Sequence, residues 1–288
     1  MSGTEDMGSS EAESLCDSLA FTRATMNHGV HDHSRTVPAP LPDAERVSLA
    51  GAVGELGGYI WRQPGQAPAA LLLHGWGQDA LAMAGPARLL HGAGWQVLSM
   101  SQRGWRGSAG CDDYGYSGPA DVGRMLAWFA AQPGVQAPPV LLGFSMGGLS
   151  ALLTASRPGR PAGSVSHVVA VSAPTDLQAV YERTTLRLLR RCYDAVLTAA
   201  QWREGSPVTH VSGLQVPALL VVGTQDRICM PEVGRQYAAA AGAPLLEHAD
   251  MGHSPNDAQW HAIIREVMAW TQEPASGRSR LAPDPSTG

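Results

Sequence analysis

The chain contains no lysine, because all 20 of its basic residues are arginine. This absence excludes a lysine Schiff base and a serine–lysine dyad from any catalytic site. The 25 acidic residues leave a net charge of only −5. Since neither sign dominates, neither nucleic acid nor an anionic membrane surface is an expected partner.

Cysteine is scarce and widely spaced, at Cys16, Cys111, Cys192 and Cys229. No C-x-x-C pair occurs, so the sequence predicts neither a zinc site nor a disulfide framework, and we interpret all four as free thiols in a reducing cytoplasm. The N-terminus lacks the basic and apolar segments of a signal peptide. No apolar run approaches the length of a membrane span. We therefore expect a cytoplasmic protein without membrane contact.

The sequence predicts one folded domain, residues 45–273, between two polar segments. Residues 1–44 are rich in Ser, Gly, Glu and Pro and predict a flexible leader, and residues 274–288 predict a flexible tail. The leader contains His28, His31 and His33. Because no cysteine or carboxylate framework accompanies them, we interpret them as a solvated cluster rather than a metal site.

Between these segments, strand-like and helix-like stretches alternate. Residues 46–53 and 56–62 predict an antiparallel pair. The remaining predicted strands are 69–73, 96–100, 139–142, 165–171, 218–222 and 245–247, and the predicted helices are 80–91, 118–131, 146–155, 231–241 and 256–270. This alternation indicates an α/β fold with a mostly parallel sheet covered by helices on both faces.

The alternation lapses at about residues 174–213. Helical spacing over residues 176–201 predicts a short helical insertion near the C-terminal ends of the strands, where open α/β sheets bind ligands. The insertion is either a lid over that site or an ordinary pair of surface helices.

The pentapeptide Gly143-Phe144-Ser145-Met146-Gly147 follows an apolar strand and precedes a helix. This G-x-S-x-G pattern is typical of a sharp strand-to-helix turn that exposes a serine hydroxyl, and its glycines allow neighbouring elements to approach closely. The first N–H groups of the helix lie beside that hydroxyl. We therefore predict that Ser145 is a nucleophile.

A serine nucleophile needs a base and an acid that orients the base. His253 follows the last predicted strand, and Asp226 follows the preceding one, which gives the chain order Ser…Asp…His expected for this turn. Asp176 is the main competitor for the acid, and Asp250 lies very close in sequence to His253. We favour His253 over three other histidines in range, His210, His248 and His261.

The segment His74-Gly75-Trp76-Gly77 ends an early predicted strand. Its glycines allow the loop to fold over the nucleophile, so that the N–H groups of Trp76 and Met146 form an oxyanion hole. We interpret His74 as bracing this loop. The predicted substrate pocket is mainly apolar, which favours a hydrophobic substrate, and comprises His74, Phe144, Trp105, Ile228 and Met230. For Trp105 and Ile228, ordinary packing is an equally good interpretation.

With these features in this order, residues 46–272 resemble the α/β-hydrolase superfamily. Similarity to the prolyl-oligopeptidase-like and dienelactone-hydrolase-like branches rests on residues 103–108 (RGWRGS), on Asp121-Val122 before an apolar helix that ends in Trp128, and on residues 205–210 (GSPVTH) ahead of Val216-Pro217. Oligopeptidases of this kind carry a β-propeller before the hydrolase domain. Here, only a leader and one strand pair precede the oxyanion strand, so the resemblance implies a small acyl substrate rather than an oligopeptide.

We therefore expect a serine hydrolase that cleaves a small carboxylic ester, thioester or lactone and needs no metal or organic cofactor. The same machinery serves acyl transfer, cyclisation or acyl elimination in a biosynthetic pathway. These reactions differ from hydrolysis in whether water reaches the acyl-enzyme. A peptidase and a non-catalytic binding protein are the remaining hypotheses.

Overall fold

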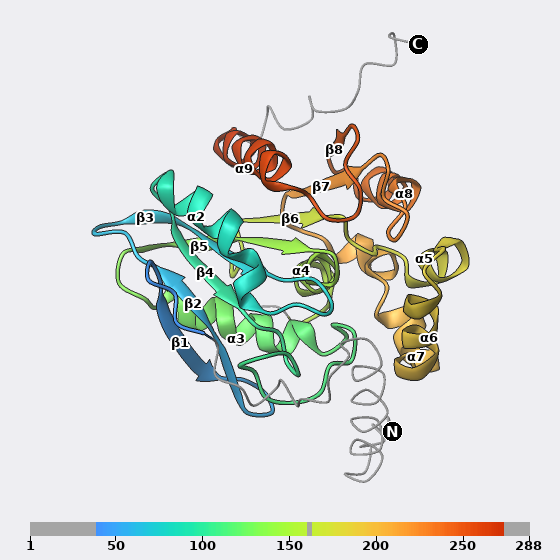
Figure 1. Cartoon of the computed structure of the whole chain (residues 1–288), viewed down its shortest axis with the longest axis horizontal. Helices are drawn as coiled ribbons and strands as arrows, with labels where there is room; N and C mark the ends of the chain where they lie inside the picture. Colours follow the sequence, from blue (N-terminus) through green and yellow to red (C-terminus); the bar gives the residue numbers. More distant parts are fainter. Residues whose placement is uncertain (1–38, 160–162, 274–288) are drawn as a thin grey trace.

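The computed structural model describes residues 39–159 and 163–273. Within them, eight strands form one sheet in the order β1-β2-β4-β3-β5-β6-β7-β8 (Figure 1). The pairs β1–β2 and β2–β4 are antiparallel, and all the other pairs are parallel. The strands are β1 (Glu45–Ala50), β2 (Glu55–Trp61), β3 (Ala67–Leu73), β4 (Gln96–Met100), β5 (Val135–Phe144), β6 (His167–Val171), β7 (Ala218–Gly223) and β8 (Leu245–His248). The predicted α/β architecture is confirmed.

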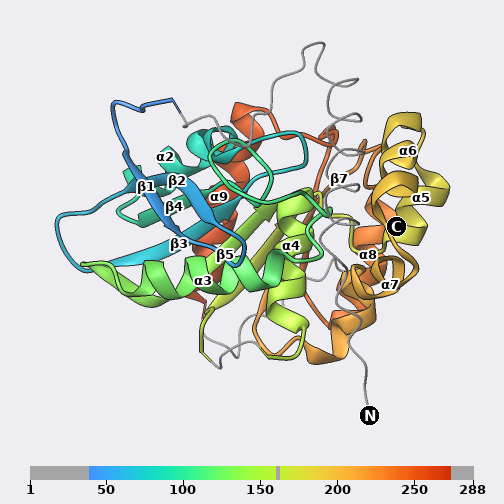
Figure 2. The same ribbon diagram turned by 90° about the horizontal axis from the view of Figure 1, so that it is seen from below.

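Helices cover both faces of the sheet. On one face lie α3 (Gly118–Ala130), α4 (Met146–Ser156) and α8 (Pro231–Ala241), and on the other lie α2 (Ala84–Gly92) and α9 (Asp257–Gln272), as Figure 2 shows. Successive strand residues point to opposite faces. Leu71 and Leu73 accordingly pack into the α3/α4/α8 cluster, whereas Ala70 and Leu72 pack into the α2/α9 cluster. This double burial explains why the central strands read as continuous apolar runs.

Most predicted elements occur within a few residues of their expected bounds. The predicted helix at 80–91 is a 3₁₀ turn, η2 (Ala80–Met83), followed by α2. Strand β5 begins four residues before the expected start. Its first residues pair with the start of β3, and the ladder then shifts register between Pro68 and Ala70.

The predicted helical insertion is present between β6 and β7. It consists of α5 (Leu177–Arg183), α6 (Arg187–Val196), α7 (Ala199–Glu204) and a 3₁₀ segment, η3 (Pro207–Gly213). The three α-helices gather at one edge of the molecule beside α8 (Figures 1 and 2). Their buried side chains form a third apolar cluster with residues of α4, including Met146 and Leu149.

Residues 39–44, which the sequence assigns to the leader, lie against the domain. The Tyr59 hydroxyl donates to the Ala39 carbonyl, and Asp43 accepts from the Trp61 indole at 3.0 Å and pairs with Arg88 at 2.7 Å. The rest of the predicted leader, with its three histidines and Cys16, and the predicted tail lie outside the described residues.

One cysteine prediction is wrong. Cys111 is disulfide-bonded, whereas Cys192 and Cys229 are buried thiols outside any disulfide. Disulfides are rare in reducing compartments. The cysteines therefore do not support a cytoplasmic location, which stays a prediction. Among the described residues, no helix has the length and apolar character that a membrane span requires.

Candidate active site

Ser145 occupies the sharp turn between β5 and α4. Its backbone has φ 50° and ψ −120°, a left-handed conformation that a non-glycine residue adopts only when its surroundings hold it there. Its N–H donates to the Val171 carbonyl at 2.8 Å, which ties the turn to β6. A Cβ atom at Gly143 would collide with the Gly147 carbonyl, and one at Gly147 would collide with the Leu73 carbonyl. The turn therefore requires glycine on both sides of the serine.

The structure brings Ser145, His253 and Asp226 into one hydrogen-bonded chain. Ser145 Oγ lies 2.9 Å from His253 Nε2, and His253 Nδ1 lies 2.8 Å from Asp226 Oδ2. An ionised carboxylate only accepts hydrogen bonds, so Nδ1 carries the proton of a neutral imidazole and Nε2 accepts from the serine hydroxyl. This is the tautomer in which His253 can take the Ser145 proton.

Asp226 is held by the backbone that follows β7. Its second oxygen, Oδ1, accepts from the N–H groups of Ile228 and Cys229 at 2.8 and 2.9 Å. Its side chain has no exposed surface, whereas the His253 side chain is 16% exposed. Phe144 packs against His253, with ring centroids 5.4 Å apart. Asp226 is therefore buried with both carboxylate oxygens hydrogen-bonded, whereas His253 remains partly exposed.

The loop after β3 is anchored beside this chain. His74 is fully buried: its Nδ1 donates to the Gly75 carbonyl at 2.8 Å, and its Nε2 accepts from the Gln102 N–H at 2.9 Å. Burial lowers the pKa of His74 to about 4, so the ring is neutral near pH 7. These contacts fit the predicted bracing role, and its place in the substrate pocket stays a prediction. Trp76 is half-buried, and Met146 begins α4, where a helix leaves its first N–H groups without intrahelical partners.

The competing acids serve elsewhere. Asp176 caps α5 by accepting from the Ala179 N–H at 3.1 Å. Asp250 is exposed and accepts from the Gln225 side chain at 2.9 Å.

The competing histidines also lie in other surroundings. His210 contacts the Glu204 carbonyl, His248 lies 3.0 Å from Glu266, and His261 is on the exposed side of α9. In the described part of the chain, no group of three or more His, Cys, Asp or Glu side chains could hold a metal ion.

The predicted pocket residues differ in how deeply they are buried. Trp105 is buried and packs edge-to-face against His74 and Trp76, with ring centroids 6.3 and 6.2 Å apart. Ile228 and Met230 are half-buried and pack against the apolar cluster of the insertion. Their place in the substrate pocket stays a prediction.

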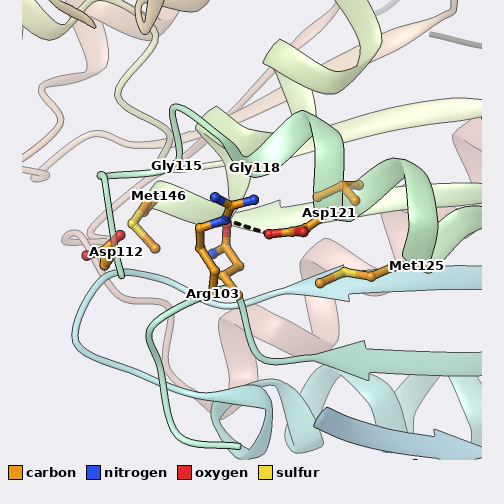
Figure 3. Close-up of a pocket in the computed structure, with 9 residues that line it drawn as sticks. Arg103, Asp112, Gly115, Gly118, Asp121, Met125 and Met146 are labelled. Carbon is orange, nitrogen blue, oxygen red and sulfur yellow. Dashed lines mark hydrogen bonds and ion pairs between the residues drawn. The ribbon is translucent and has the colours of Figure 1, made fainter. Parts of the chain in front are cut away.

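A small pocket beside Met146 was not predicted from the sequence (Figure 3). Arg103 crosses it to pair with Asp121 at 2.6 Å, and Asp112 lines its other side. The sequence signal for this pocket is the position of Asp112, because its loop follows the C-terminal end of β4, and open α/β sheets bind ligands at the C-terminal ends of their strands.

Comparisons with known proteins agree with this architecture. A family model described as the alpha/beta hydrolase family matches residues 70–266. An uncharacterized peptidase, YtmA of Bacillus subtilis, is 28% identical over 174 residues. That alignment covers 57% of this chain and 65% of the relative, so the chain spans less than two thirds of that protein's length.

Solved structures share the fold. The Pyrococcus furiosus esterase Pf2001 superposes with a TM-score of 0.63 at 19% identity, covering 82% of this chain and 97% of that one. A puromycin-hydrolyzing peptidase of Mycobacterium tuberculosis superposes with a TM-score of 0.65 at 16% identity, covering 81% of this chain and 40% of that one. The shared architecture is the α/β-hydrolase fold.

Proposed function

Because the chain belongs to the alpha/beta hydrolase family, we propose that it is a serine hydrolase that cleaves a small carboxylic ester, thioester or lactone through an acyl-enzyme on Ser145. The observation that carries this proposal is the hydrogen-bonded chain from Ser145 through His253 to Asp226, with distances of 2.9 and 2.8 Å. A buried acid, an oriented base and a strained serine are the three parts of an activated nucleophile.

In the acylation step, Ser145 Oγ attacks the acyl carbon and its proton passes to His253 Nε2. Asp226 stabilises the resulting imidazolium through the hydrogen bond to Nδ1. The N–H groups of Trp76 and Met146 bind the oxyanion of the tetrahedral intermediate. Removing one such donor typically costs about 3 kcal/mol in the transition state. His253 then protonates the leaving group, which departs as an alcohol or thiol.

In the deacylation step, His253 removes a proton from water while the water oxygen attacks the acyl carbon. The second tetrahedral intermediate uses the same two N–H donors. When it collapses, Ser145 leaves and recovers its proton from His253 Nε2, and the carboxylic acid is released. No step requires a metal or an organic cofactor.

The apolar surroundings favour a hydrophobic acyl or alcohol group. Trp76, Ile228 and Met230 are half-buried and belong to the apolar cluster beneath the insertion. Amide cleavage is the second candidate, because the relative from Bacillus subtilis and the puromycin-hydrolyzing neighbour are named as peptidases. The same triad cleaves both bonds, but an amine is the poorer leaving group and depends more on its protonation by His253.

Two measurements on the purified protein test this proposal. A fluorophosphonate probe should label the wild type and fail to label Ser145→Ala; equal labelling would remove Ser145 from the nucleophile role. A panel of p-nitrophenyl esters, thioesters, lactones and aminoacyl anilides should show turnover of esters above that of anilides. The opposite order would identify an amidase.

A further inference from the structure

Three residues of the loop that carries the proposed oxyanion donor, His74, Gly75 and Trp76, are each held by a hydrogen bond. The His74 ring is held by the Gln102 N–H, and the Gly75 N–H donates to the Gln78 side chain at 3.0 Å. Trp76 is anchored through its side chain, because its indole N–H donates to Asp112 Oδ2 at 2.9 Å. The anchors of His74 and Trp76 therefore both come from the loop between β4 and α3.

Asp112 is well placed for such a role. It is 4% exposed, and its second oxygen, Oδ1, accepts from the Tyr114 N–H at 2.9 Å. Tyr114 has φ 55°, an uncommon conformation for a bulky residue that must be enforced by its surroundings. Asp112 and Met146, the second proposed donor residue, line the same small pocket (Figure 3).

The helical insertion contacts the same loop from the other side. The Tyr193 hydroxyl of α6 donates to the Tyr114 hydroxyl at 2.9 Å, and the two rings meet edge-to-face with centroids 4.7 Å apart. Burial raises the pKa of both tyrosines well above the usual range, so both hydroxyls remain protonated and can hydrogen-bond. The Tyr114 ring also lies 6.4 Å from the Trp76 ring. Buried contacts thus hold the Asp112 loop on both sides.

We propose that Asp112 is a positioning residue that fixes the Trp76 N–H for oxyanion binding, through its hydrogen bond to the Trp76 indole. This inference rests on the proposed function. The indole and the backbone N–H of Trp76 are joined through one Cα, so fixing the ring restricts the peptide plane that carries the donor. An oxyanion donor works only when it is held close to the position of the developing charge, and a displacement of about 1 Å removes much of its effect.

The competing interpretation is that Trp76 is only a wall of the substrate pocket. In that case, loosening its ring would weaken substrate binding and raise KM. If Asp112 positions an oxyanion donor instead, its loss should lower kcat and leave KM nearly unchanged, because the oxyanion exists only in the transition state and the intermediates.

The experiment measures kcat and KM for p-nitrophenyl acetate in single and double variants, each checked for an unchanged melting temperature. We expect Asp112→Ala to lower kcat about tenfold, less than the 10²- to 10³-fold typical of losing a donor outright. Asp112→Asn keeps one acceptor oxygen, so its kcat should fall less, by about threefold. Trp76→Phe removes the indole N–H and keeps an aromatic ring. Because both substitutions break the same hydrogen bond, kcat of the double variant Asp112→Ala/Trp76→Phe should fall no further than kcat of the more impaired single variant.

Asp113 supplies a matched control. It is the neighbouring acid in the same loop, is half-buried, and accepts from the Ser117 N–H rather than from Trp76. Asp113→Ala should keep kcat within about twofold, as expected when a partly exposed residue is changed away from the reacting groups.

Three results would overturn the proposal: losses that multiply in the double variant, a loss that falls mainly on KM, or an equal loss in Asp113→Ala. Ser145→Ala separates this inference from the proposed function. Wild-type turnover in Ser145→Ala would refute both, whereas Ser145-dependent turnover that is insensitive to Asp112→Ala would refute only the positioning role.

Discussion

Asp226→Asn is expected to abolish most activity while leaving the fold intact. In the wild type, Oδ1 accepts from the N–H groups of Ile228 and Cys229, and Oδ2 accepts from His253 Nδ1. The asparagine oxygen should take the side with two backbone donors, since turning the amide would leave both of them facing an NH₂ group. The NH₂ group then faces His253.

This arrangement inverts the tautomer of the base. An NH₂ group donates, so His253 Nδ1 must accept and the ring proton moves to Nε2. Nε2 can then no longer accept the proton of Ser145. The expected loss in kcat is about 10⁴-fold, or about 5 kcal/mol in the activation free energy. Because the two backbone hydrogen bonds survive, the expected loss of stability is only about 1 kcal/mol, or a fall of about 3 °C in Tm.

The assay is turnover of p-nitrophenyl acetate alongside thermal unfolding of the same samples. Asp176→Asn is the matched control. Like Asp226, Asp176 follows a parallel strand, and its side chain accepts a backbone hydrogen bond, in this case as the cap of α5. It should lose less than about 1 kcal/mol of stability and keep its turnover. A loss below tenfold in Asp226→Asn, or an equal loss in Asp176→Asn, would refute the assignment of the acid.

Two further predictions concern stability. The pKa of His74 is about 4 in the folded chain and about 6.5 when unfolded, so the unfolded state binds more protons between these values. Stability should therefore rise with pH from about 4 to 6.5, by at most about 3 kcal/mol, and His74→Gln should flatten this slope in urea titrations at several pH values. Gly147→Ala would force a Cβ atom onto the Leu73 and His74 carbonyls and should cost more than about 2 kcal/mol, whereas Gly123→Ala on α3 meets open space and should stabilise by about 0.5–1 kcal/mol in chemical denaturation. Equal effects of the two alanines would contradict the packing argument.

The sequence predicted the parts of the site that local patterns encode. The G-x-S-x-G turn is local, because its glycines and its strand-to-helix change lie within a few residues of Ser145. The positions of Asp226 and His253 follow from topology, since the ends of neighbouring parallel strands meet at one edge of the sheet.

Other parts depend on contacts that no local pattern marks. Asp112 contacts Trp76 across 36 residues, and the loop between β4 and α3 that carries Asp112 has no periodicity from which its path could be predicted. The disulfide of Cys111 has no local signal, because cysteines far apart in sequence are brought together only by the fold. Asp176 and Asp226 both follow parallel strands, so only the geometry of their hydrogen bonds separates them.

The insertion shares its core with α4, the helix that begins at the Ser145 turn, and this restricts how a substrate can enter. Tyr193 of α6 has no exposed surface, and Leu189 and Cys192 are buried beside it in the cluster that contains Met146 and Leu149. If α6 moved away from the sheet, the Tyr193 side chain by itself would expose about 200 Å² to water, at a cost of about 5 kcal/mol. The half-buried residues Ile228 and Met230 can move at lower cost. We therefore expect the substrate to enter past these side chains while α6 stays docked, so that the Tyr193–Tyr114 contact persists through turnover.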